Sequence, residues 1–375
     1  MKQGWEIKKL GEIATYINGY AFKPEHWGED GLPIIRIQNL NNPNAEFNYC
    51  SLDVPDKYVI DNGDILISWS ASLGVYEWNQ GKAYLNQHIF KVLFNKIEIN
   101  KFFFKYAIGA KIKDMIKNAH GATMKHIVKG DFDNTPIPVP PLPVQERIVS
   151  ELDLQIGIIE KKREQLKELD ALAQSIFYDM FGDPMQSSYN IIPLSKLSDN
   201  KLSYGSGASA IPYNGEIRYI RITDIKDDGK LNAEAVSPSI MEDKYILNEG
   251  DILFARSGAT VGKTYLYKEG DGKAIYAGYL IRFIPNKEHV LPTYIYYYTK
   301  TDYYKAFISK SAQAVAQPNI NAQQYGSLMV PVPPLPLQHQ FATKIEAIER
   351  QKELIKQSIS ETETLFNASM QEHFG

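Results

Sequence analysis

The chain of 375 residues repeats itself once along its length. Three short motifs occur twice in the same order, and the distance between the two copies of a motif grows from 185 to 193 residues. A period of this length is far longer than the repeat of a solenoid, so it indicates two tandem domains of one fold. The motifs are IRI at 35–37 and 220–222, GDIL at 63–66 and 250–253, and PPLP at 140–143 and 333–336.

Each copy begins with a strand-rich part that leads into a helix. Short runs of β-branched and aromatic residues, bounded by Asn, Gly and Asp, predict strands at 34–37, 64–69 and 88–94. A segment rich in aromatic residues and lysine then predicts one helix in each copy, at about 100–118 and about 291–309.

A proline-dense stretch follows, at 135–143 in the first copy and 330–336 in the second. Proline cannot continue a helix or a central strand, because it lacks the backbone N–H and clashes with the preceding turn. We therefore expect each stretch to be an extended, semi-rigid connector.

A long helical pattern comes after each connector. Core positions recur every seven residues in two rows shifted by four, over about five heptads, which is typical of a coiled-coil seam. Polar residues within the rows cost stability and often fix register or partner. Gly182, with Pro184 behind it, predicts the end of the first helix. The rows are Leu152, Ile159, Leu166, Ala173 and Met180 with Ile148, Gln155, Lys162, Leu169 and Ile176, then Phe341, Ile348, Ile355, Thr362 and Ser369 with Ile345, Lys352, Ile359 and Phe366.

Two such helices, one per copy, are expected to pack on each other. A seam of about 36 residues corresponds to roughly 54 Å of helix, which is longer than packing on one domain requires. An antiparallel pair would relate the two domains by a pseudo-two-fold axis. The alternative is that each helix lies on its own domain.

Composition excludes several classes of protein. The 41 Lys+Arg and 44 Asp+Glu give a net charge of −3, so DNA contact would need a local patch rather than a basic coat. The single cysteine, Cys50, excludes a disulfide framework and fits a reducing cytoplasm. The N-terminal segment lacks the apolar core of a secretory signal, and no apolar run approaches the roughly 18–20 residues that cross a bilayer.

No catalytic motif is convincing in this sequence. The segment GATVGKT at 258–264 resembles a phosphate-binding loop, but three residues separate its glycines where that loop has four. The Gly-rich loop and Pro-Pro-aromatic segment of an adenine methyltransferase, the carboxylate-lysine pattern of common nucleases and an H-x-x-x-H pair are all missing. We therefore expect no catalytic residue, no metal and no cofactor in this chain.

Several residues suit contact with DNA. Residues 101–129 carry seven lysines against one acid, Asp114, which fits either phosphate contact or a solvated helix face. Base edges are read by paired donors and acceptors such as those of Arg, Asn and Gln. Arg36 and Arg221 fall at equivalent positions, so the alternative for both is a role in the shared fold. The candidates are Arg36, Gln38, Asn39, Ser68, Gln87, His88 and Lys125, then Arg221, Thr223, Asp224, Arg256, Ser257, Lys263, Gln317 and Asn319.

The pattern resembles the specificity (S) subunits of type I restriction-modification systems. The tandem repeat, the PPLP segment followed by QERI at 145–148, and the long helix after each copy carry the resemblance, together with GW at 4–5, LGEI at 10–13 and the GDIL motif. The second copy departs from the family pattern, with QHQ at 338–340 and an opening IPL at 192–194 that lacks Gly-Trp.

The resemblance implies an α+β chain with target-recognition domains at 1–142 and 183–335 and long antiparallel coiled-coil helices at 143–182 and 336–375. Each domain would read one half of a bipartite, asymmetric site in double-stranded DNA. The helices would fix the spacer and dock two methyltransferase subunits, which restriction subunits would join. S-adenosylmethionine, ATP and Mg would belong to those partners. The expected docking residues are Ile148, Leu152, Ile159, Leu166, Ile345, Ile348, Ile355 and Ile359.

Two other functions remain open from the sequence. The chain could be a non-catalytic scaffold with two protein-interaction domains on a coiled coil, or a self-contained methyltransferase or nuclease. Salt dependence of binding to random duplex separates a DNA reader from a scaffold. Deleting one or two heptads from one helix is expected to change the spacer and leave both half-sites intact.

Overall fold

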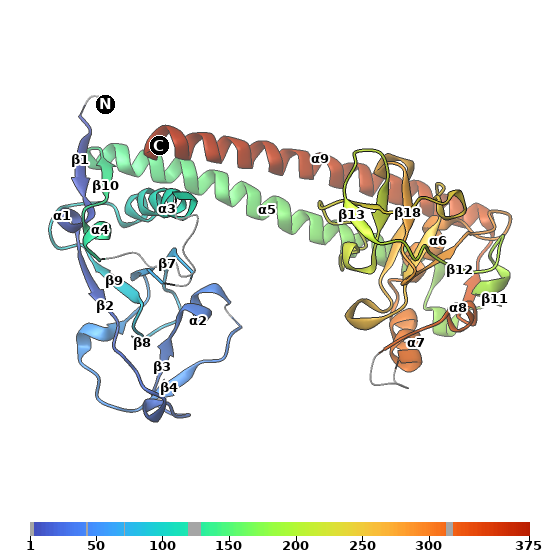
Figure 1. Ribbon diagram of the computed structural model, residues 1–375, viewed down its shortest axis with the longest axis horizontal. Helices are drawn as coiled ribbons and strands as arrows, with labels where there is room; N and C mark the ends of the chain where they lie inside the picture. The colour runs from blue at the N-terminus through green and yellow to red at the C-terminus, as the bar shows by residue number, and fades with distance from the viewer. Residues whose placement is uncertain (1–3, 43, 71, 119–128, 313–317) are drawn as a thin grey trace. The chain divides into compact units, whose positions relative to one another are not determined.

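The structure is a computed structural model. Contacts group the chain into two units, and each unit combines one repeat with part of both long helices (Figure 1). Unit 1 comprises Met1–Lys162 and Gln357–Gly375, and unit 2 comprises Arg163–Lys356. The described residues are 4–42, 44–70, 72–118, 129–312 and 318–375, without the side chains of 113–118.

The described residues of unit 1 form three sheets. β1 pairs antiparallel with β10, a four-stranded antiparallel sheet has the order β2-β9-β6-β7, and a second four-stranded sheet has the order β4-β3-β8-β5 with β3 and β8 parallel. The elements are β1 Glu6–Lys9, α1 Leu10–Ile13, β2 Thr15–Asn18, β3 Leu32–Ile35, α2 Ile37–Asn41, β4 Asn48–Cys50, β5 Val59–Ile60, β6 Ile65–Ser68, β7 Gly74–Glu77, β8 Ala83–Leu85, β9 Ile89–Leu93, α3 Lys101–Asn118, α4 Lys129–Asp133 and β10 Pro136–Val139.

Unit 2 repeats this plan. β11 pairs with β20, a four-stranded sheet has the order β12-β19-β16-β17, and β14 and β18 form the parallel pair, while β13 pairs with β15. The elements are β11 Asn190–Pro193, β12 Ser203–Tyr204, β13 Ala210–Pro212, β14 Arg218–Ile220, β15 Val236–Pro238, β16 Ile252–Ala255, β17 Thr264–Leu266, β18 Ala274–Tyr276, β19 Leu280–Phe283, α6 Pro292–Tyr298, α7 Asp302–Ala312, α8 Ala322–Gly326 and β20 Met329–Val332.

The two long helices are α5 (Leu142–Phe181) and α9 (Leu335–Phe374), and they run antiparallel within each unit (Figure 1). In unit 1 the Gln155 side chain donates to the Ser369 hydroxyl at 3.2 Å. In unit 2 the ring centroids of Phe177 and Phe341 lie 5.6 Å apart. Every residue of the expected heptad rows is buried or half-buried, so the prediction of a paired seam is confirmed.

Both cores join a sheet to the long helices. In unit 1, Phe103 of α3 packs against Phe374 of α9, with ring centroids 5.3 Å apart, and both side chains are buried. In unit 2, Phe181 of α5 and Phe341 of α9 pack against Tyr294 of α6. Each repeat therefore uses the helix pair as one wall of its core.

The expected proline-rich connectors are partly strands. Pro136 and Pro138 lie in β10, which pairs with β1, and Pro331 lies in β20, which pairs with β11. Prolines two residues apart place their missing N–H groups on the same edge of a strand, and that edge faces away from the single partner. A two-stranded sheet therefore accepts them where a central strand would not.

Two other boundaries differ from those expected. The strand expected at 34–37 ends at Ile35, because the backbone N–H of Arg36 bonds the Asn39 side chain and begins α2. The helix expected at about 291–309 is two helices, α6 and α7. The Thr301 hydroxyl accepts the N–H of Tyr304 at 3.3 Å, which caps a new helix one turn after α6 ends.

Candidate DNA interface

The strand registers place the two repeats in detailed correspondence. In unit 1, Ser68 pairs with Ile89 across β6 and β9, and in unit 2, Ala255 pairs with Leu280 across β16 and β19. The residue after β6 is Trp69 and the residue after β16 is Arg256. Their N–H groups donate to the carbonyls of His88 and Tyr279, at 3.2 and 3.1 Å. These four residues therefore form two equivalent pairs.

Arg36 and Arg221 occupy the same position of the shared scaffold. The N–H of Arg36 donates to Asn39 Oδ1 at 3.1 Å, and the N–H of Arg221 donates to Asp224 Oδ2 at 2.9 Å. The Arg221 guanidinium also forms an ion pair with Asp224 at 2.8 Å. The Asn39 amide bonds the carbonyls of residues 45 and 46 as well. Asn39 and Asp224 are buried and fully engaged, so the structure gives both a structural role.

The other candidates in unit 1 lie near the ends of β6 and β8. Ser68 is completely buried, and its hydroxyl bonds the carbonyl of Ser72. His88 has a φ of +73°, an unusual conformation for a residue other than glycine, and its ring lies 4.9 Å from that of Trp69. Gln87 is half-buried beside it, and Gln38 is exposed on α2.

In unit 2, four candidates gather around the end of β16. Ser257 and Asn319 form an isolated antiparallel β-bridge outside the strands, and the Arg256 Nε donates to Asn319 Oδ1 at 3.3 Å. Lys263 forms an ion pair with Asp227 at 2.7 Å. Thr223 is exposed in the turn after β14.

Two candidates, Lys125 and Gln317, lie outside the described residues. The same holds for part of the lysine cluster at 101–129. Of its described lysines, Lys105 lies 3.9 Å from Glu77 and Lys129 lies 2.8 Å from Asp133. Acidic partners on unit 1 therefore neutralise part of the expected basic patch.

Sequence reasoning missed three residues that lie beside these candidates. Asn18, at the end of β2, accepts a hydrogen bond from the Trp69 indole at 3.1 Å. Tyr204, at the corresponding end of β12, lies under the Arg256 guanidinium at 4.8 Å from the ring centroid. Tyr279 is 62% exposed. An aromatic residue next to a glycine at the boundary of a short strand was the available signal, since Tyr204 precedes Gly205 and Tyr279 follows Gly278.

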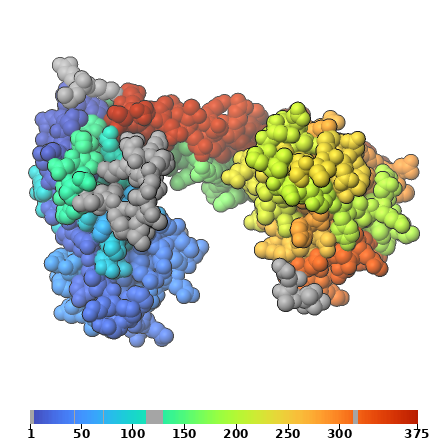
Figure 2. All heavy atoms as spheres, viewed as in Figure 1, coloured from blue at the N-terminus to red at the C-terminus, as the bar shows by residue number. Residues whose placement is uncertain are grey.

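The helix residues expected at a docking surface hold the seam together. Ile148, Leu152, Ile159, Ile345 and Ile348 are buried, and Leu166, Ile355 and Ile359 are half-buried. A partner therefore meets other faces of these helices, and parts of both helices remain on the surface (Figure 2). The exposed leucines are Leu154 and Leu365 in unit 1 and Leu172 and Leu354 in unit 2.

Charged residues also meet the long helices inside unit 2. Burial lowers the pKa of Lys300 to about 8, although the carboxylates of Asp228 and Asp170 oppose this shift. Burial would likewise lower the pKa of Lys352 in the seam. Its bonds to Asp170 at 2.5 Å and Glu349 at 2.6 Å instead raise that pKa above its usual value.

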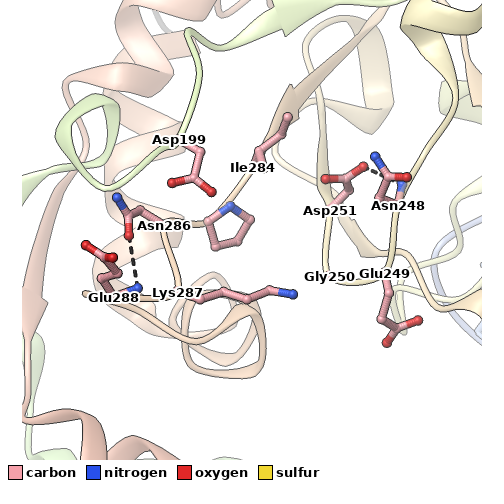
Figure 3. A pocket seen from close by; sticks show the side chains of 10 residues that line it. Asp199, Asn248, Glu249, Gly250, Asp251, Ile284, Asn286, Lys287 and Glu288 are labelled. Carbon is pink, nitrogen blue, oxygen red and sulfur yellow. Dashed lines mark hydrogen bonds between the residues drawn. The ribbon is translucent and has the colours of Figure 1, made fainter.

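A pocket of about 460 Å³ in unit 2 does not fit DNA (Figure 3). Its lining includes the carboxylates of Asp199, Glu249 and Glu288 with one lysine, Lys287, so it is acidic and repels phosphate. The described residues contain no group of three His, Cys, Asp or Glu side chains placed to hold a metal ion. No helix in the described part of the chain is long and apolar enough to cross a membrane.

Comparison with known families identifies the repeated unit. A family model described as the type I restriction modification DNA specificity domain matches residues 2–169 and 206–364. The chain belongs to this family. The matches cover most of both repeats, which confirms the resemblance and the expectation of two target-recognition domains in an α+β chain.

Individual specificity subunits resemble the chain over nearly its full length. The EcoBI specificity subunit of Escherichia coli is 21% identical, covering 95% of this chain and 81% of the relative. The MjaVIII specificity subunit of Methanocaldococcus jannaschii is 25% identical, covering 92% of this chain and 86% of the relative.

Solved structures show the same fold. The S subunit of a type I system from M. genitalium has a TM-score of 0.57 at 14% identity, covering 99% of this chain and 96% of that chain. A chain from a structure of type I restriction-modification complex assembly has a TM-score of 0.61 at 15% identity, covering 100% of this chain and 98% of that chain.

Proposed function

We propose that this chain is the DNA-reading subunit of a type I restriction-modification complex. Each unit reads one half of a bipartite site in double-stranded DNA. One observation carries the proposal: both units place different side chains, Trp69 and Arg256, on the same backbone position of the same sheet. Two domains of the same fold with different side chains at the reading position suit a DNA site whose two halves differ in sequence. Such a site is asymmetric.

The paired helices give the reader its spacing. Each helix is 40 residues long, and both contribute to the core of each unit. At 1.5 Å per residue a helix of this length measures about 60 Å, enough to bridge an unread spacer between half-sites. The exposed leucines on the outer faces, Leu154, Leu172, Leu354 and Leu365, provide apolar contacts for two methyltransferase subunits.

The chemistry belongs to the partners in this proposal. The chain itself is a non-catalytic subunit, and it works in the cytoplasm with methyltransferase and restriction subunits. S-adenosylmethionine binds to the methyltransferase subunits, and ATP and Mg bind to the partners as well. Membership of the DNA specificity family favours this function over a scaffold that binds only proteins.

A first experiment measures whether the chain binds DNA. The purified chain is titrated with random duplex at several salt concentrations. A DNA reader gives a steep negative slope of log affinity against log salt, because bound cations are released from the phosphates. A slope near zero contradicts the proposal and favours the protein scaffold.

A second experiment tests the assembly. The chain is co-expressed with a type I methyltransferase subunit, the complex is purified, and modified adenines are mapped on genomic DNA. Two short motifs separated by a fixed gap, with one modified adenine on each strand, support the proposal. Failure to co-purify, or modification without a split motif, argues against it.

A further inference from the structure

Tyr204 ends β12 and Arg256 follows β16, at the same end of the β12-β19-β16 sheet. The shared fold does not require these two side chains. In unit 1 the corresponding backbone positions hold Asn18 and Trp69, while unit 2 holds Tyr204 and Arg256 there. The sheets keep the same order and register although these side chains differ completely in size and charge. A position that varies while the backbone stays the same is free to serve recognition.

Arg256 is fixed in place without being neutralised. Its guanidinium carbon lies 4.8 Å from the centre of the Tyr204 ring, and its Nε donates to Asn319 Oδ1 at 3.3 Å. The Tyr204 hydroxyl accepts the N–H of Ala322 at 3.0 Å, which holds the ring in turn. These contacts hold the guanidinium through its Nε and against the Tyr204 ring, and they do not engage its two terminal nitrogens.

Two other described arginines in unit 2 have a buried acidic partner within the protein. Arg221 and Arg282 form ion pairs with Asp224 and Asp251, and both carboxylates are buried. For Arg256, no carboxylate of the described chain lies within ion-pair distance, and none of its described neighbours accepts a hydrogen bond from the terminal nitrogens. Its guanidinium keeps two parallel donors free, and its backbone N–H donates to the carbonyl of Tyr279, whose side chain is exposed.

We infer that Arg256 reads a guanine in the major groove of the half-site bound by unit 2, with Tyr204 and Asn319 as positioning residues. The inference rests on the proposed function. Two parallel N–H donors match O6 and N7 of guanine, which is the commonest specific contact of arginine with a base. A lysine matches this pair of acceptors less well, because its ammonium group is a flexible point charge without a planar pair of donors. Unit 1, with Trp69 at the same position, lacks this contact.

The test selects bound sequences from a library of duplexes in which both half-sites and the spacer are random. The full chain, its Arg256→Gln and Arg256→Lys variants and a control, Arg350→Gln, are compared by sequencing the bound DNA. Arg350 is an exposed arginine of α9, outside the set of candidates. The unaltered chain is expected to select a guanine at one position of one half-site. Arg256→Gln should lose that preference by roughly 10- to 100-fold, with the other half-site unchanged.

The variants separate base reading from other roles. Arg256→Lys should also lose most of the preference, whereas Arg350→Gln should keep it. Asn319→Ala should weaken the preference at the same position by a smaller factor, and thermal unfolding midpoints confirm that each variant folds. If Arg256→Gln instead lowers affinity equally for all sequences and reduces the salt slope by about one, Arg256 contacts a phosphate and the inference is wrong.

The outcomes also distinguish this inference from the proposed function. If the unaltered chain selects a split motif and Arg256→Gln keeps every base preference, the guanine contact is wrong and the DNA-reading function stands. If the unaltered chain selects no sequence at all, both are wrong.

Discussion

Asp251 and Arg282 form an ion pair of 2.5 Å inside unit 2, and only 3% and 7% of their side-chain surfaces are exposed. Unit 1 contains the same pair as Asp64 and Lys91 at 2.9 Å, with 25% and 17% exposed. In each pair the aspartate directly precedes a strand, β6 or β16, and its partner lies in the neighbouring strand, β9 or β19, so the ion pair belongs to the shared scaffold. The copy in unit 2 is the more deeply buried.

Asp251→Asn is expected to destabilise unit 2 by roughly 3 kcal/mol, because it leaves a buried guanidinium without its counter-charge. Asp64→Asn should cost unit 1 about 1 kcal/mol, since water reaches that pair. All four tryptophans lie in the first 80 residues, so tryptophan fluorescence follows unit 1 and circular dichroism follows both units during urea unfolding. Equal losses for the two variants would show that burial does not set the cost.

Gly205→Ala is expected to disrupt unit 2. An added Cβ at Gly205 would lie 2.3 Å from the Tyr276 carbonyl oxygen, and backbone atoms of a sheet cannot move away at low cost. We expect a loss of roughly 3 kcal/mol. Gly207→Ala is the matched control, because an added Cβ there meets nothing within 4 Å. Thermal unfolding of both variants measures the difference, and a similar midpoint for both would contradict the expectation.

Gln338 joins the start of α9 to the start of α6. Its side chain accepts the N–H of Leu291 at 2.8 Å and donates to the carbonyl of Pro333 at 2.7 Å. Gln338→Ala leaves these buried groups without partners, and we expect it to cost about 2 kcal/mol. Gln340→Ala, at an exposed position two residues on, should change stability by less than about 0.5 kcal/mol. The urea unfolding midpoints of the two variants measure this difference. Equal midpoints would mean that water replaces the hydrogen bonds of the Gln338 amide.

Lys300 is expected to make unit 2 more stable as the pH rises. Burial lowers its pKa to about 8 in the folded chain, whereas an unfolded lysine has a pKa of about 10.4. Between these values the unfolded chain holds more protons, so stability increases with pH. Lys300→Met should therefore gain up to about 3 kcal/mol at pH 7 and little at pH 10.5. The control is Lys305→Met, in an exposed ion pair. A constant gain at every pH would refute the assignment.

Shortening both helices together should shorten the spacer. Lys162 bonds Ser358 across the seam, so residues 160–166 lie opposite 354–360. Removing both segments keeps the heptad pattern and shortens the pair by about 10 Å, or roughly three base pairs. Mapping modified adenines in the assembled complex should show the same half-sites at the shorter distance. An unchanged gap would mean that the helices do not set the spacing.

The sequence predicted the parts of the fold that depend on periodic burial. The heptad rows and the duplication followed directly from spacing, because every core position recurs at a regular interval. The break between α6 and α7 was missed, since the capping role of Thr301 depends on where the preceding turn ends. The strands that contain Pro136 and Pro331 were missed. Each pairs with one neighbour only, so a proline fits where its missing N–H faces the unpaired side.

The candidate site was predicted less well than the fold. Arg256 and Asn319 were found as polar residues near strand ends, and the structure joins them. Asn18 and Tyr204 were missed because their position follows from strand register, which links residues far apart in the sequence. Asn39 and Asp224 were predicted to contact bases because their side chains carry hydrogen-bonding groups. In the structure those groups cap a turn by accepting the N–H of Arg36 and Arg221.

The core of unit 1 is completed by Phe374, which lies against Phe103. Unit 2, in contrast, is drawn entirely from residues 163–356. During synthesis the ribosome releases the whole of unit 2 before it releases the last helical turns that unit 1 needs. The repeat that is translated first is therefore the one whose core is completed last.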